Sequence, residues 1–127
     1  MIINTPISIG ELMDKISILQ IKKKNIKDKN KLSFINEELF LLEKILTNSI
    51  NDSKINSYLN KLLEINTTLW EIEDKIRECE KNNKFDQDFV ELARSVYKTN
   101  DKRSEVKLEI NNYFGSKLVE VKSYEKY

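Results

Sequence analysis

The feature that most constrains this chain is a long stripe of apolar residues between positions 52 and 83. Its members recur at alternating steps of three and four residues, which keeps them on one side of an α-helix. About thirty helical residues make a rod roughly 45 Å long, which only a bundle can cover. The sequence therefore predicts a helical bundle. The stripe consists of Ile55, Tyr58, Leu62, Ile65, Leu69, Ile72, Ile76 and Cys79.

A first helix is expected to begin after Ser8 and to end near Lys27. Ser8-Ile-Gly-Glu11 is a capping box, in which the Ser8 hydroxyl accepts from one free amide and Glu11 covers another. The apolar face of this helix is wide, which indicates contact with two neighbouring helices. Asp14 continues that face and is expected to be less exposed than most aspartates. Gly10 is expected to allow close packing of the C-terminal segment, the alternative being the approach of another backbone or an anion to the free amides of this helix.

The remaining helices are predicted from the same spacing. A second helix covers about residues 32–48 and is more apolar than contact with one helix requires. Asp52 or Ser53 is expected to cap the long third helix. Asp86 is expected to cap a fourth helix, and Gly115 to end it in the left-handed conformation. We therefore predict an all-α, antiparallel four-helix bundle with two shorter and two long helices.

The two ends of the chain are expected to be extended, and residues 1–127 are expected to form a single domain. Met1–Ile7 and Ser116–Tyr127 both alternate loosely in the manner of β-strands. Both lie near one end of the predicted bundle, so they could pair with each other.

Composition excludes several classes of function. Twenty-two basic and 21 acidic side chains nearly cancel, so no overall charge favours nucleic acid or anionic lipid. No uncharged apolar run approaches the length of a membrane span. A single cysteine and the absence of a visible signal peptide favour a cytoplasmic protein. Histidine is absent, which removes the commonest acid-base group and transition-metal ligand, and no cofactor is expected.

Arginine is rare in this chain, with three residues against 19 lysines. If the third and fourth helices form a regular hairpin, facing residues have numbers that sum to roughly 169. Arg77 then faces Glu91, and Arg94 faces Asp74. These pairs are expected to be ordinary interhelical ion pairs that fix the register.

Arg103 is the unusual arginine, because it occupies an apolar seam position of the fourth helix. A buried guanidinium without a partner costs several kcal/mol. Its partner could be Asp14, Asp101, Asn66, a second chain or a bound anion, or the side chain could reach solvent instead. If Arg103 stays inside, we expect a cleft for a small carboxylate or phosphate ligand. The candidate ligand-binding residues are Asp14, Trp70, Asp74, Arg77, Arg94, Tyr97, Asn100 and Arg103.

No catalytic residue and no metal site is predicted. Glu71-x-x-Asp74 and Asp88-x-x-Glu91 resemble halves of the acidic motifs that hold Mg²⁺ in all-helical nucleotide pyrophosphohydrolases. The hairpin register, however, sets them about a turn apart, and Arg77 and Arg94 lie between them. Whether the protein is an enzyme stays open.

Four motifs in combination resemble an uncharacterised bacterial family of short helical proteins, known only as a domain of unknown function. They are I-N-T-P-I-S-I-G-E-L-M-D-K (3–15), L-W-E-I-E-D-K-I-R (69–77), A-R-S-V-Y-K-T-N-D-K-R (93–103) and G-S-K-L-V-E-V-K-S-Y (115–124). The resemblance implies a cytoplasmic bacterial or phage-borne protein. It implies no activity and no catalytic residue.

Three functional hypotheses follow. The first is a non-enzymatic helical interaction module that forms a homo-oligomer, expected to be a homodimer held by coiled-coil-like contacts between helix faces. The alternative is a small-anion or nucleotide-binding protein, with or without enzymatic activity, that uses the arginine-containing cleft between helices. The third is a Mg²⁺-dependent hydrolase, which requires Glu71, Asp74 and other carboxylates to converge.

Overall fold

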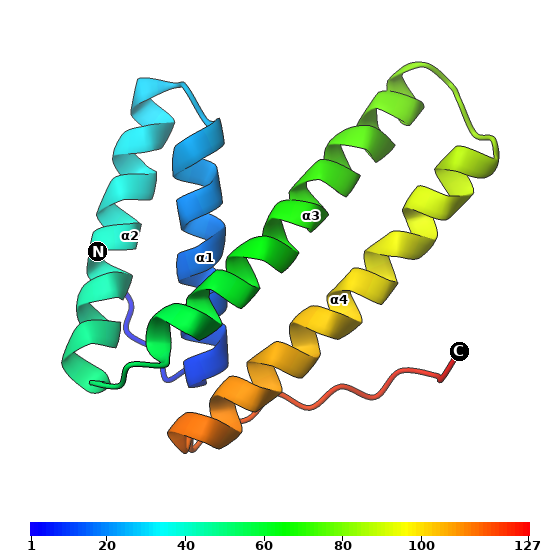
Figure 1. Ribbon diagram of the computed structural model, residues 1–127. Coiled ribbons are helices and arrows are strands. Elements are labelled where there is room, and N and C mark those ends of the chain that lie inside the picture. The colour runs from blue at the N-terminus through cyan, green and yellow to red at the C-terminus, as the bar shows by residue number, and fades with distance from the viewer.

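The computed structural model describes residues 1–127 and contains four α-helices and no strand (Figure 1). The all-α four-helix bundle predicted from the sequence is confirmed, with two shorter and two longer helices. The helices are α1 (Ile9–Asn25), α2 (Lys29–Ser49), α3 (Ile55–Lys81) and α4 (Gln87–Phe114).

Helix α1 is the centre of the fold. It packs against each of the other three helices, whereas α2 packs against α1 alone. The wide apolar face of α1 therefore serves three neighbours rather than the two that its sequence indicated. Because α2 has a single neighbour, its outer side stays in solvent, and Phe34 and Phe40 are 75% and 65% exposed.

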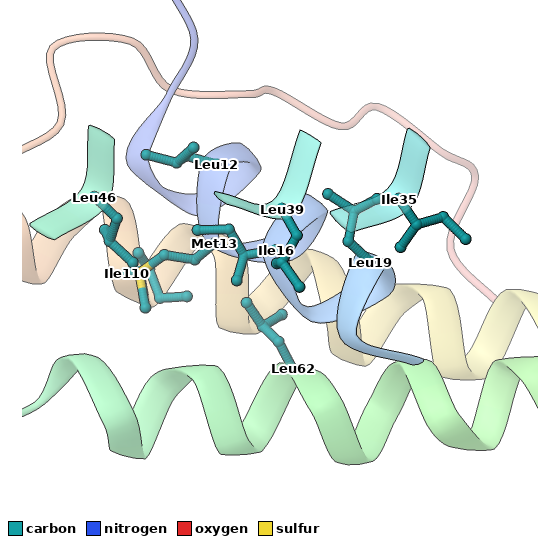
Figure 2. Close-up of a cluster of buried hydrophobic side chains, with 9 residues drawn as sticks. All are labelled: Leu12, Met13, Ile16, Leu19, Ile35, Leu39, Leu46, Leu62 and Ile110. Carbon is teal, nitrogen blue, oxygen red and sulfur yellow. The ribbon is translucent and has the colours of Figure 1, made fainter. Parts of the chain in front are cut away.

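The hydrophobic core lies where α1 meets the other helices (Figure 2). Met13 and Ile16 of α1 are completely buried, as are Leu62 of α3 and Ile110 of α4. Burial of side chains of this size contributes about 1.5–3 kcal/mol each relative to exposure. The core cluster comprises Leu12, Met13, Ile16, Leu19, Ile35, Leu39, Leu46, Leu62 and Ile110.

Most helix ends follow the predicted signals. The side chains of Ser8 and Asp86 accept bonds from the first turns of α1 and α4, and Gly115 ends α4 with φ of 69°. The expected cap of α3 is wrong, because its N-cap residue is Lys54 and makes no side-chain cap bond. Asp52 instead accepts from the Lys54 amide at 2.8 Å, which orders the turn before the helix.

The expectation that the two ends of the chain pair as strands is wrong. Both ends are extended, but neither forms a strand, and the C-terminal segment runs back along α4 (Figure 1). This segment, residues 116–127, is called the tail below. Side-chain contacts hold the tail on α4, including a 2.7 Å bond from the Tyr127 hydroxyl to Asp101.

The far half of the α3–α4 pair stands free of the rest of the molecule. The turn between α3 and α4 lies well away from the turn between α1 and α2 (Figure 1). Between Ile72 and Lys107 the chain has no buried residue. We call residues 78–95 the projection. Separately, none of the four helices combines the length and apolar character that a membrane span requires.

Candidate functional site

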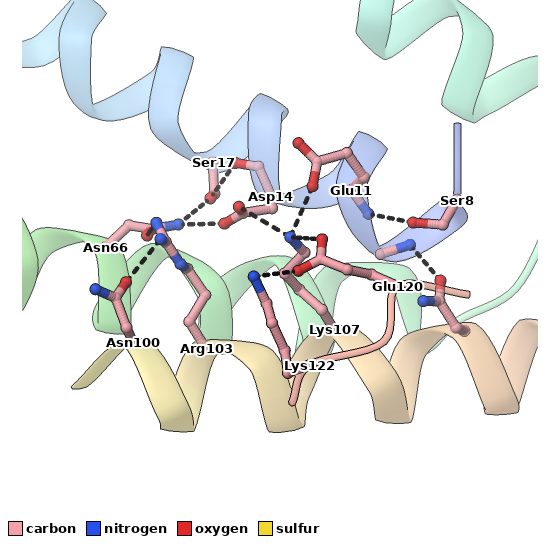
Figure 3. Close-up of polar contacts among 12 residues, drawn as sticks. Ser8, Glu11, Asp14, Ser17, Asn66, Asn100, Arg103, Lys107, Glu120 and Lys122 are labelled. Carbon is pink, nitrogen blue, oxygen red and sulfur yellow. Dashed lines mark hydrogen bonds and ion pairs between the residues drawn. The ribbon is translucent and has the colours of Figure 1, made fainter. Parts of the chain in front are cut away.

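A polar cluster lies where α1, α3 and α4 cross, and Asn66 connects its members (Figure 3). The Asn66 amide donates to Asp14 Oδ1 at 2.7 Å and to Ser17 Oγ at 2.8 Å. Its oxygen accepts from Arg103 at 3.1 Å. The predicted proximity of Asn66 and Arg103 across the hairpin is therefore confirmed. Asn66 is buried, and its single amide group links the cation of Arg103 to the carboxylate of Asp14.

Arg103 itself has no carboxylate partner. Its two terminal nitrogens donate to amide oxygens, one to Asn66 and one to Asn100 at 2.7 Å. No carboxylate lies within ion-pair distance of its guanidinium. The side chain is partly buried, so it neither lies free in solvent nor forms a closed ion pair with Asp14. A guanidinium offers five N–H donors, so several stay free for another acceptor.

Lys107 forms the second half of the cluster. The residue is only 8% exposed, and its ammonium lies 2.6 Å from Glu11, 3.1 Å from Glu120 and 3.8 Å from Asp14. These carboxylates come from α1 and from the tail, so Lys107 joins three segments of the fold. No buried side-chain nitrogen or oxygen in the chain lacks a hydrogen-bond partner.

The ionisation of this cluster follows from its contacts. Burial by itself lowers the pKa of Lys107, but the hydrogen bonds that it donates to Glu11 and Glu120 and the charge of Asp14 outweigh this effect. The pKa of Lys107 is therefore raised. Hydrogen bonds from Lys122 and then from Lys107 lower the pKa of Glu120.

Docking of the tail is expected to depend on pH. Because the pKa of folded Glu120 lies below its ordinary value of 4.5, its contribution is present above that pH and is lost as the pH falls through the depressed pKa. The contribution of Lys107 is present below its ordinary pKa of 10.5 and is lost as the pH rises through the raised value. Backbone ¹⁵N relaxation of residues 118–127 is expected to show a docked tail near pH 7 and a mobile tail near pH 3.

The control for this prediction is Glu120→Gln, which removes the charge without shortening the side chain. This variant is expected to show a loosened tail already near pH 7, with a smaller response to acid. Identical relaxation of the wild-type tail at both pH values would contradict the role given to Glu120.

The close approach of α1 to α4 determines where the polar cluster lies. A Cβ atom at Gly10 would lie 2.6 Å from the Lys107 carbonyl oxygen, so only glycine fits there. The Gly10 amide donates to Asn111 Oδ1 at 2.7 Å. The expectation that Gly10 makes room for the C-terminal segment is therefore wrong, since its neighbour is α4. Ile9 and Glu11 donate to Ser116 and Ser8, so the first amides of α1 are already bonded.

Two cavities open on either side of Arg103. The tail cavity, of about 460 Å³, lies between α4 and the tail and is lined in part by Tyr97, Asn100 and Lys122. The Trp70 cavity, of about 500 Å³, is lined by Asn66, Trp70 and residues of α1. Arg103 lines both cavities.

Comparison with known proteins assigns the chain to a family. A model described as a family of unknown function, DUF6165, matches residues 3–127. The chain belongs to DUF6165. None of the curated proteins and none of the solved structures matches it. The matched range includes the projection and the tail of this DUF6165 protein.

The structure divides the predicted ligand-binding residues of this DUF6165 chain into two groups. Tyr97, Asn100 and Arg103 line the tail cavity. Trp70, Asp74 and Arg77 line the Trp70 cavity together with Arg103. Asp14 is buried behind Asn66, and Arg94 lines neither of these cavities. The residues thus gather around Arg103 without forming one cleft.

The predicted interhelical ion pairs are wrong. Arg77 lies 3.9 Å from Glu73 of its own helix, and Arg94 lies 3.0 Å from Glu91 of its own helix. Hydrogen bonds with Tyr97 and Glu91 raise the pKa of the exposed Arg94 guanidinium. In solvent a partner one turn away on the same helix needs no particular hairpin geometry, which favours these local pairs.

Sequence reasoning missed Glu11, Lys107 and Glu120 in this DUF6165 fold. Lys107 lies four residues after Arg103, so it shares a helix face with it, but 19 lysines gave no reason to choose this one. Glu11 was expected to cap α1 and binds Lys107 instead. No group of three or more acidic or cysteine side chains is arranged to hold a metal ion, so the two acidic motifs do not converge.

Proposed function

We propose that this protein is a homodimeric helical interaction module in which the projections of two copies pack against each other. The observation that carries the proposal is the absence of any buried residue between Ile72 and Lys107. The apolar stripes of α3 and α4 continue through the projection, where each helix has only the other as a neighbour. Three members of the stripes in the projection are partly buried, namely Cys79, Phe89 and Leu92.

Partial burial leaves some of the available stabilisation unused. Complete burial of an Ile, Leu or Phe side chain is worth about 1.5–3 kcal/mol, so each partly exposed side chain leaves a fraction of that for a further contact. Two antiparallel helices cover each other along one seam only. A second pair of helices laid against the first completes a four-helix arrangement of the kind that buries such seams.

The distribution of charged residues favours a second copy of the chain as the partner that covers the projection. Residues 71–91 carry eight acidic and four basic side chains, a net charge of −4. Residues 22–31, around the turn between α1 and α2, carry six lysines and one aspartate, a net charge of +5. None of these lysines forms an ion pair within the chain, and of the acidic groups on α3 in this range only Glu73 does, with Arg77.

An antiparallel pair of projections brings these charges together. In such a dimer the tip of each projection reaches back toward the base of its partner's projection, beside the partner's lysine-rich turn. Opposite charges then meet twice, once on each side of a twofold axis. Each copy contributes the same surface, so the assembly ends at two copies and does not extend into a filament.

Reciprocal charge reversal tests this dimer. Lys27→Glu with Lys29→Glu is expected to weaken dimerisation at least about tenfold in sedimentation equilibrium, as is Glu78→Lys with Glu80→Lys. Combining all four changes is expected to restore it. Both reversals are compatible with their helices, since acids suit the start of α2 and bases suit the end of α3. Added salt is expected to weaken the wild-type dimer.

The matched control is Lys15→Glu with Lys44→Glu, which reverses two exposed lysines away from the turn and is expected to leave dimerisation unchanged. Equal dimerisation of wild-type protein and the Lys27/Lys29 variant would contradict the proposed surface. Loss of the dimer only in a Phe34→Ser, Phe40→Ser variant would place the interface on α2 instead.

A second candidate function is the binding of a small anion at Arg103. It is favoured by a partly buried guanidinium that has no carboxylate partner and lines two cavities. Its neighbours Asn66 and Asn100 hold the guanidinium in place without neutralising it. An arginine held in this way is suited to a planar, two-point contact with carboxylate or phosphate.

Calorimetric titration with inorganic phosphate tests this second function. Wild-type protein is expected to bind phosphate, and Arg103→Lys is expected to bind it at least about tenfold more weakly, because lysine keeps the charge and loses the fork of donors. Equal heats from both proteins would exclude Arg103 as the anion contact.

A further inference from the structure

We infer that the tail cavity binds a nucleoside monophosphate, with its phosphate on Arg103 and Lys122 and its flat ring against tyrosines of α4 and the tail. This inference assumes the second candidate function and adds the choice of cavity and the class of ligand. The cavity of about 460 Å³ is within the usual range for small-molecule sites.

The main cation of the tail cavity is held in place before any ligand binds. Arg103 is fixed by Asn66 and Asn100, so little rotamer entropy is lost when it binds an oxyanion. Lys122 lies on the same cavity, and its present partner is Glu120 of the tail. A phosphate bound between these two cations takes the place of the Glu120 carboxylate at Lys122. Lys122 then keeps a negatively charged partner.

The aromatic end consists of Tyr97, Tyr124 and Tyr127. The rings of Tyr97 and Tyr127 pack edge to face with centroids 5.2 Å apart, and the two residues are 43% and 75% exposed. Stacking of a base on an aromatic side chain is worth about 1–3 kcal/mol and does not depend on which base is bound. The combination of exposed rings and a guanidinium that has no carboxylate partner is the chemistry that a nucleotide requires.

The acidic groups of the cavity limit how many phosphates fit. Asp101 accepts from the Tyr127 hydroxyl, Glu120 is bound by Lys107 and Lys122, and Glu125 has no ion-pair partner. Three acidic and three basic side chains therefore line the cavity. Since this balance leaves little surplus positive charge, one phosphate fits better than a di- or triphosphate.

The Trp70 cavity is the less suitable of the two. Its second cation, Arg77, is 80% exposed and lies 3.9 Å from Glu73. It offers one large aromatic ring, that of Trp70, whereas the tail cavity offers three. Trp70 is also the chain's single tryptophan and does not line the tail cavity, so its fluorescence distinguishes binding on its own side of Arg103 from binding in the tail cavity.

The experiment is a titration of the full chain with adenosine 5′-monophosphate, followed by NMR shifts of ¹⁵N amides and tyrosine rings and by Trp70 fluorescence. Shifts are expected at Asn100, Arg103 and Tyr127, with unchanged tryptophan fluorescence. Adenosine and inorganic phosphate are each expected to bind at least about tenfold more weakly than the nucleotide, since each offers only half of the contacts.

Variants on the exposed tail keep the test independent of folding. Lys122→Gln is expected to weaken nucleotide binding by about threefold or more, and the matched tail variant Lys117→Gln is expected to leave it unchanged. Arg103→Lys is expected to weaken it at least about tenfold, with an unchanged circular dichroism spectrum.

Three results would overturn the inference: no shifts at about 10 mM nucleotide, equal affinities of wild type and Arg103→Lys, or a response of Trp70 without one of Tyr127. Phosphate binding that depends on Arg103 without any preference for the nucleotide would reject the nucleotide and retain the anion site. Sedimentation of the same samples reports on the dimer separately.

Discussion

Replacement of Lys107 by methionine is expected to destabilise the fold by roughly 3 kcal/mol, the lower end of the cost of breaking a buried ion pair. Methionine fills a similar volume but leaves Glu11 and Asp14 without their cation. The lower end applies because the side chains of Glu11 and Glu120 are 32% and 34% exposed and regain some hydration. A fall of roughly 10 °C in the unfolding midpoint is expected by calorimetry or circular dichroism.

The matched control is Lys102→Met, which removes an exposed lysine with no ion pair from the same helix. It is expected to change the free energy of unfolding by less than about 0.5 kcal/mol. Adding Glu11→Gln to Lys107→Met is expected to cost less than the sum of the single changes, since the two residues share one interaction. Equal stability of the Lys107 and Lys102 variants would show that the pair contributes nothing.

Replacement of Gly10 by alanine is expected to destabilise the fold by about 2 kcal/mol, although alanine is the better helix former. The added Cβ would lie 2.6 Å from the Lys107 carbonyl oxygen and 3.0 Å from Asn111 Oδ1. A backbone oxygen within a helix cannot move alone, so α1 and α4 must separate. That movement stretches the bond from the Gly10 amide to Asn111 and the contact between Glu11 and Lys107. Chemical denaturation measures the loss.

Gly115→Ala provides the comparison. No atom lies within 4 Å of the position that its Cβ would take, so the cost there comes only from the left-handed backbone with φ of 69° and is about 1 kcal/mol. A Gly10→Ala protein that is more stable than wild type would show that helix propensity outweighs the close approach of α1 and α4.

The helices could be predicted from the sequence because their signals are local. Apolar residues at steps of three and four fix which side of each helix is buried, and Ser8, Asp86 and Gly115 mark ends by bonds within one turn. The contact between Asn66 and Arg103 could be predicted too, because a short turn sets the register of α3 against α4. Arg103 was conspicuous as a charged residue at an apolar position.

Much of the polar cluster could not be predicted, because its contacts join distant parts of the chain. Lys107 binds Glu11 and Glu120, and which lysine meets which glutamate depends on the angle at which α1 crosses α4. That angle follows from the close approach at Gly10, which involves two backbones. The course of the tail also depends on side-chain contacts, such as that of Tyr127 with Asp101, and not on a strand pattern.

The two halves of the molecule differ in how completely the chain covers its own apolar side chains and pairs its own polar groups. Around α1 the core is closed and every buried polar side-chain atom is bonded. In the projection, the same three-four pattern of apolar residues continues without a covering layer. This contrast within one pair of helices is the physical basis of the proposed dimer.

Sedimentation equilibrium of the wild-type protein at low salt, over a wide range of concentrations, tests the proposed dimer most directly. We predict a mass of two chains that falls toward one on dilution or when salt is added. A mass of one chain at every concentration would contradict the dimer, and the projection would then be a hairpin that is stable in water without a partner.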